Sequence, residues 1–149
     1  MVDTLTSEGD YMEKSDNVRD TLLVYIAAAL DIAGSIKIEV PRKTGDERGS
    51  SLLVWITSKK FKLMELLQKR GAFVTPTADG QYRGKWKDRN AARLLKQLMP
   101  YLSLRKAQAK IGVEFIEERE QNPTEHTDAI YRLRLKLQKR ADEDDSDKK

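Results

Sequence analysis

Residues 25–36 read YIAAALDIAGSI, and this stretch marks the point where a helix passes into a strand. Upstream of it, apolar side chains recur at helical spacing from Val18 to Leu30, and Gly34 is of the residue type that most often follows a helix C-terminus. From Ser35 to Val40, apolar and polar residues alternate, as they do in a strand that is buried on one face. The sequence therefore predicts a helix that stops at Gly34 and leads without a loop into a strand.

Downstream, the pattern predicts further strands and helices. Asp79 and Gly80 form a turn signal between two alternating segments, which predicts a β-hairpin. The expected order is helix, strand, strand, helix, strand, strand and then helices, which is typical of an α+β domain with an antiparallel sheet and helices on one face. After the first strand, the expected elements are strand 50–57, a helix between Ser58 and Gly71, strands 72–77 and 81–87, and helices 88–99, 104–120 and 129–140.

The composition of the 149 residues fits one domain with a small core, because 39% are hydrophobic and 35% are charged. The absence of cysteine excludes disulfides and thiolate metal sites, and the single histidine, His126, excludes a histidine cluster. No apolar run approaches membrane-spanning length, and the N-terminus lacks the features of a signal or transit peptide. We therefore expect a cytoplasmic protein without a membrane partner.

Charge is distributed unevenly along the chain. Residues 1–16 carry five acids and one lysine, and residues 141–149 carry five acids and two lysines. The net charge of +4 is therefore the balance of a body at +11, residues 17–140, and two ends that together hold −7. We interpret the ends as disordered acidic tails. The basic body indicates a polyanion partner, although a solvated basic surface would look the same.

Two segments resemble the signature of the LAGLIDADG homing endonucleases. Residues 26–34 are similar to the nine-residue motif, and residues 99–109 are similar to a Pro-aromatic-Leu turn that leads into a basic residue and a Gln-Ala helix start. The resemblance covers residues 18–121. It implies an αββαββα unit with a saddle-shaped sheet, and a homodimer of single-motif chains that bind double-stranded DNA. Small residues let two motif helices approach closely, so the expected interface is Ala27, Ala28, Ala29 and Leu30; the alternative is an ordinary buried, alanine-rich helix.

The resemblance also implies a set of catalytic positions, and most of them are changed here. The eighth motif position is a carboxylate that binds a divalent metal in the family, and here it is Ala33, whose methyl group cannot hold Mg²⁺. On the second strand, the family has a polar residue at a position that Trp55 occupies here. The basic position before the fourth helix is retained as Arg105. Asp31 occupies the sixth motif position, for which the resemblance implies a structural role. It would be catalytic, with Mg²⁺ as cofactor, only if the enzyme is active.

The resemblance implies that the open face of the sheet enters the major groove, so alternate strand residues are the candidate DNA contacts. Leu53 and Trp55 share this face, where a merely solvated surface would not favour them. The candidate DNA-binding residues are Lys37, Glu39, Arg42, Lys43, Ser51, Thr57, Thr75, Thr77, Gln81, Arg83, Lys85 and Lys87.

Four functions are compatible with the sequence. The leading hypothesis is a DNA-binding pseudo-enzyme that does not cut, such as a relic of an intron or mobile element, with no metal or cofactor. The second is an active, Mg²⁺-dependent, site-specific endonuclease. The third is an RNA-splicing maturase, and the fourth is a protein-interaction module that uses Leu53 and Trp55.

Overall fold

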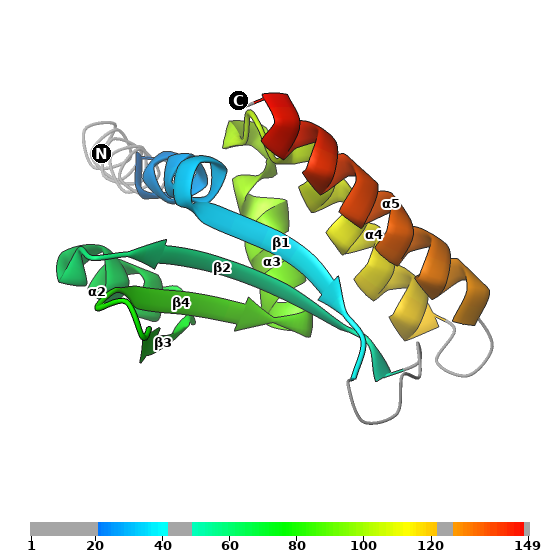
Figure 1. The fold of residues 1–149 in the computed structure, drawn as a ribbon, viewed down its shortest axis with the longest axis horizontal. Helices are drawn as coiled ribbons and strands as arrows, with labels where there is room; N and C mark the ends of the chain where they lie inside the picture. Colours follow the sequence, from blue (N-terminus) through cyan, green and yellow to red (C-terminus); the bar gives the residue numbers. More distant parts are fainter. Residues whose placement is uncertain (1–20, 42–48, 122–126, 148–149) are drawn as a thin grey trace, which may run out of the picture.

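The computed structural model of the chain describes residues 21–41, 49–121 and 127–147 (Figure 1). The expected DNA contacts Arg42 and Lys43, and the expected tail at residues 1–16, lie outside these ranges. The first described helix, residues 21–33, is named the motif helix below. It passes directly into the first strand at Gly34, as the sequence predicts.

The sheet has four strands, all paired antiparallel, in the order β1-β2-β4-β3. Two hairpins, β1-β2 and β3-β4, are thus joined through the central pair β2-β4. The strands are β1 (Gly34–Glu39), β2 (Ser51–Ser58), β3 (Phe73–Pro76) and β4 (Tyr82–Lys87).

Helices and strands occur along the chain in the predicted order, and α4 and α5 pack side by side (Figure 1). The α+β class and the antiparallel sheet predicted from the sequence are confirmed. None of the described helices is both long enough and apolar enough to cross a membrane. The helices are α2 (Phe61–Lys69), α3 (Asp88–Leu98), a 3-10 turn (Met99–Tyr101), α4 (Lys106–Gln121) and α5 (Thr127–Asp147).

The sheet buries one face against the helices and leaves the other open. In β2, Leu52, Val54 and Ile56 are fully buried, whereas the residues between them are only half-buried. Alternate residues of β1 and β4 follow the same pattern, and Trp86 is the largest side chain of the helix-covered face. Because successive side chains in a strand point to opposite faces, the core lies between the sheet and the helices.

Gly34 is required by close packing where the motif helix meets β1. A Cβ atom placed there would lie 2.8 Å from the carbonyl oxygens of both Leu30 and Trp55, and 2.5 Å from a Leu30 methyl carbon. Two of these contacts are to backbone atoms, which cannot rotate away. The absence of a side chain therefore allows the helix end to rest directly on β2.

The expected C-terminal boundary is wrong. The last helix was predicted to stop at Arg140 and to be followed by a disordered acidic tail, but α5 continues to Asp147. Asp144 is buried against α4, where its carboxylate accepts a hydrogen bond from Gln108. Residues 141–147 are therefore part of the folded domain.

Candidate nucleic-acid interface

The open face of the sheet carries side chains in rows that cross the strands. Ser35 of β1 lies opposite Trp55 of β2, Trp55 opposite Lys85 of β4, and Lys85 opposite Phe73 of β3. This row spans all four strands and places a tryptophan and a phenylalanine on either side of a lysine. Side chains directly opposite one another in antiparallel strands have Cβ atoms about 5 Å apart, so the members of a row are in contact range.

Two further rows flank the first. Leu53 lies between Lys37 and Lys87, and Arg83 lies between Thr57 and Thr75. The guanidinium carbon of Arg83 is 5.2 Å from the ring centre of Trp55, a cation–π contact that links two rows. We define the open face as Ser35, Lys37, Glu39, Ser51, Leu53, Trp55, Thr57, Phe73, Thr75, Arg83, Lys85 and Lys87.

The open face is strongly cationic. Its four cations, Lys37, Arg83, Lys85 and Lys87, are all exposed, and Glu39 is the single acid among them. Within the described ranges, none of the three lysines forms an ion pair. Arg83, Lys85 and Lys87 alternate along one strand, with neighbouring positions about 7 Å apart. Like charges at this separation repel, so a bound polyanion would lower the electrostatic free energy of this face.

Most of the expected DNA contacts lie within the strands of this face, and two lie in the turn beyond the strand ends. Thr77 and Gln81 belong to the turn between β3 and β4, where the Thr77 backbone N–H donates to the Gln81 carbonyl at 2.8 Å. The Gln81 backbone N–H in turn donates to the Thr77 hydroxyl at 3.1 Å. The polar groups of the turn thus close the hairpin. The expected contacts found on the open face are Lys37, Glu39, Ser51, Thr57, Thr75, Arg83, Lys85 and Lys87.

At the other end of the motif helix, Asp31 is engaged inside the protein. Its buried carboxylate accepts hydrogen bonds from the backbone N–H groups of Ser103, Leu104 and Arg105, at 2.8, 3.2 and 2.9 Å. These are donors that would otherwise lack a partner just before α4 begins. Asp31 thus fastens the motif helix to the start of α4, the structural role that the resemblance implies.

The residues around the helix end do not fit a divalent metal ion. Ala33 is exposed and offers only a methyl group, and the Asp31 oxygens are already held by three donors. In the parts of the chain that the structure describes, no three acidic or histidine side chains are grouped as a metal site would require. Hard cations need several free oxygen ligands, and this arrangement does not provide them.

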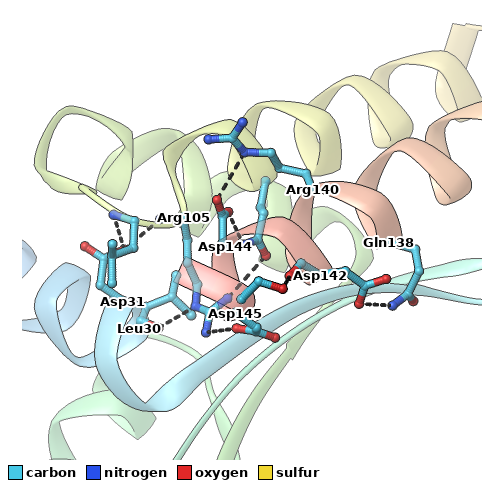
Figure 2. Close-up of polar contacts among 11 residues, drawn as sticks. Leu30, Asp31, Arg105, Gln138, Arg140, Asp142, Asp144 and Asp145 are labelled. Carbon is cyan, nitrogen blue, oxygen red and sulfur yellow. Dashed lines mark hydrogen bonds and ion pairs between the residues drawn. The ribbon is translucent and has the colours of Figure 1, made fainter. Parts of the chain in front are cut away.

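Arg105 holds the basic position that the resemblance implies to be catalytic, and here it faces the protein interior. The side chain is buried, and its Nε–H donates to the Leu30 carbonyl at 3.0 Å (Figure 2). A terminal nitrogen donates to the amide oxygen of Gln108 at 3.4 Å, and the other lies 3.7 Å from Asp145. The guanidinium is therefore used to join the motif helix, α4 and α5.

Gln108 extends this network into the acidic end of α5. Its side-chain amide donates to Asp144 at 2.6 Å, and Asp144 also pairs with Arg140 at 3.2 Å (Figure 2). Both Gln108 and Asp144 are buried, and no buried side-chain polar atom of the described residues lacks a partner. Asp144 and Asp145 of the acidic end of α5 thus complete this network.

Several solved structures that superpose on this chain are homing endonucleases. The homing endonuclease I-CvuI, crystallised with a DNA target, superposes with a TM-score of 0.70 at 18% identity, covering 79% of this chain and 80% of its own. The archaeal intron-encoded I-Vdi141I, complexed with DNA, gives 0.69 at 16% identity, with 82% and 85% covered. The LAGLIDADG enzyme I-SmaMI, bound to cleaved DNA, gives 0.59 at 13% identity, with 70% of this chain and 39% of its own covered.

The chain has the LAGLIDADG homing endonuclease fold. No protein-family profile and no curated protein matches it by sequence, so the likeness is one of fold.

Within the LAGLIDADG fold, the motif helix presents a different face from the one predicted. Ala27 and Leu30, expected at a dimer interface, are fully buried in the core of their own chain. Of the other expected interface residues, Ala28 is exposed and Ala29 is half-buried. The exposed apolar residues of this helix are Val24, Tyr25 and Ile32, the last 77% exposed, and with Ala28 they form a stripe along one side.

Sequence reasoning missed Phe73 on the open face. This side chain is 69% exposed and lies opposite Lys85. Strand alternation is sufficient to find it, because Phe73 and Thr75 are two residues apart and therefore share one face of the strand. It was missed because only polar residues of this strand were selected as candidate base contacts.

Proposed function

We propose that the chain binds duplex DNA with the open face of its sheet and does not cut it. The observation that supports binding most directly is the set of four exposed cations on a sheet face that carries a single acid, Glu39. I-CvuI and I-Vdi141I were both solved with DNA, and they share this fold. Lysine and arginine supply the phosphate contacts that fix a protein on a duplex.

Loss of cleavage is inferred from three neighbouring positions. Ala33 has no side-chain oxygen, the Asp31 carboxylate is engaged by three backbone donors, and Arg105 is buried. An active, Mg²⁺-dependent endonuclease would have to detach Asp31 from the start of α4 before it could bind a metal. The geometry therefore favours the non-cutting hypothesis over the endonuclease.

We further propose that two copies pair through the exposed stripe of Val24, Tyr25, Ala28 and Ile32. Large exposed apolar side chains on one helix are costly to leave in water, and a second copy would cover them. Substituting Ala28→Arg should convert a dimer to a monomer in analytical ultracentrifugation. The matched control is Ala78→Arg, at an exposed position of the β3–β4 turn. A monomeric wild type, or equal behaviour of the two variants, contradicts the pairing.

DNA binding is tested by its salt dependence on a mixed-sequence duplex. The logarithm of the affinity falls by about 0.9 for each phosphate neutralised, so Lys85→Ala should reduce the slope by about 0.9 per chain. Lys62→Ala, an exposed lysine of α2, removes the same charge away from the open face and should leave the slope unchanged. Absence of binding at about 50 mM salt, where phosphate contacts act strongly, overturns the proposal, as does an equal effect of the two substitutions.

Cleavage is tested on a library of duplex targets with Mg²⁺ or Mn²⁺. We expect intact DNA under conditions in which the protein is bound. Metal-dependent cutting that co-purifies with the protein and disappears on chelation contradicts the pseudo-enzyme. A structured RNA in the same binding assay separates the maturase hypothesis, because tighter binding to that RNA than to duplex DNA would replace DNA as the partner.

A further inference from the structure

Three apolar side chains lie among the cations of the open face. Leu53 is opposite Lys87, and both Trp55 and Phe73 are opposite Lys85. Leu53 and Trp55 are half-buried and Phe73 is 69% exposed. Each therefore stands beside an amine suited to a phosphate, on the surface that is proposed to face DNA.

The major groove offers one apolar feature to such side chains. Among the four bases, only thymine adds a methyl group, at C5, to the hydrogen-bonding atoms that it presents there. An apolar side chain pressed against the polar edges would remove water from them without replacing the hydrogen bonds. The complementary partner of Leu53 and Phe73 is therefore a methyl group on a pyrimidine.

We propose that Leu53 and Phe73 recognise pyrimidine C5-methyl groups and give the protein a preference for thymine at the base pairs beneath them. This inference rests on the proposed binding of duplex DNA by the open face. The specificity would come from two apolar residues, with the neighbouring lysines fixing the position of the duplex.

The arrangement argues against a stacking surface for unpaired bases. Strand β4 stands between Trp55 and Phe73, so their positions are about 10 Å apart, and Lys85 lies between them. The Arg83 guanidinium already lies over the Trp55 ring. Leu53 is not aromatic and cannot stack as a ring does. A methyl contact uses Leu53 and Phe73 as they stand.

The test removes and adds the same methyl group. Binding is measured by fluorescence anisotropy on four duplexes: alternating dA-dT and its deoxyuridine counterpart, which lacks the methyl, and alternating dG-dC and its 5-methylcytosine counterpart, which gains it. Burying one methyl group corresponds to about 0.8 kcal/mol, or about fourfold in affinity. We expect at least a fourfold loss on going from thymine to uracil, and a gain of similar size on methylation of cytosine.

Two variants and a matched control assign the preference to this face. Leu53→Ala and Phe73→Ala should each reduce the ratio of the affinity for the thymine duplex to the affinity for the uracil duplex. The double variant should bring this ratio close to one. The control is Phe61→Ala, because Phe61 is also an exposed phenylalanine, 56%, but packs edge-on against Tyr82 on the helix-covered side. Phe61→Ala should keep the full ratio.

The outcomes separate this inference from the function on which it rests. Equal affinity for all four duplexes overturns the methyl contact and leaves DNA binding intact. No binding to any duplex at low salt overturns both. Tighter binding to single-stranded oligo-dT than to the duplex overturns the methyl contact in favour of base stacking. If Phe61→Ala lowers the thymine-to-uracil affinity ratio as much as Leu53→Ala or Phe73→Ala does, the assignment to Leu53 and Phe73 is overturned.

Discussion

The open face of the sheet and the end of the motif helix contain similar residue types and use them in opposite ways. On the open face, Lys37, Lys85 and Lys87 are exposed and form no ion pair within the described ranges. At the helix end, Asp31 and Arg105 are buried: backbone donors just before α4 hold Asp31, and the motif helix, α4 and α5 all contact Arg105. Charge in one region is available to a ligand, and in the other it is satisfied by the fold. A charged residue at a familiar motif position thus indicates function only when its hydrogen-bonding capacity is free.

Asp31→Ala is expected to have the largest effect among the substitutions that test this difference between the two regions. The substitution leaves three backbone donors at the start of α4 without their acceptor, and we expect a loss of about 3 kcal/mol in the free energy of unfolding. Urea denaturation measures it. Asp79→Ala, at an exposed turn position, should change the value by less than about 0.5 kcal/mol. An Asp31→Ala protein as stable as the wild type would show that this carboxylate is free for chemistry.

Gly34→Ala tests the junction between the two regions. The new methyl group would press on the carbonyl oxygens of Leu30 and Trp55, and overpacking of this kind costs about 2 to 3 kcal/mol. Thermal and urea unfolding should both report the loss. Because Trp55 is on the open face, we also expect its fluorescence to shift in the folded variant. Unchanged stability would mean that β2 can move away from the helix end.

Asp144→Ala tests whether the buried acid at the end of α5 contributes more to stability than its exposed neighbour. It leaves the buried Gln108 amide without its acceptor, so we expect a loss of about 2 kcal/mol in urea unfolding. Asp142→Ala removes an equal charge from the same helix, but Asp142 is exposed, and its carboxylate accepts a hydrogen bond from the Gln138 side chain at the protein surface. That control should change stability by less than about 0.5 kcal/mol. Equal effects would restore the interpretation of this segment as a solvated tail.

The smallest expected effect on stability belongs to Arg83→Ala. Its cation–π contact with Trp55 contributes about 0.5 to 1 kcal/mol, whereas its removal should lower the salt slope of DNA binding by about 0.9. Arg93→Ala, an exposed position of α3, provides the charge-matched control and should leave the slope unchanged. A large loss of stability with no change in slope would assign Arg83 to the structure of the sheet.

Strand alternation predicted much of the open face correctly because its physical basis is local. Once β2 buries Leu52 and Val54, Leu53 and Trp55 must lie on the other side, and no tertiary information is needed. The same rule placed Lys37 and Lys85 on that side. The element order, and the abrupt passage from helix to strand at Gly34, were also readable from local patterns.

The errors arose where long-range contacts decide. In an alanine-rich helix, small side chains occur on every side, so periodicity did not show that Ala27 and Leu30 belong to the core. Composition marked residues 141–147 as a tail, but Asp144 finds its partner Gln108 36 positions away. The pairing of Arg105 with the Leu30 carbonyl spans 75 positions, and no sequence pattern encodes it.

The strand order has a consequence for how the binding surface can change over evolution. Because β2 and β4 pair with each other, every row of the open face from β1 to β3 combines residues of two hairpins that are separate in the sequence. A shift of one residue along this seam would turn one hairpin's outward side chains inward and expose its hydrophobic ones. Point substitutions can therefore retune recognition, whereas an insertion or deletion within β2 or β4 would disrupt the recognition surface and the core at once.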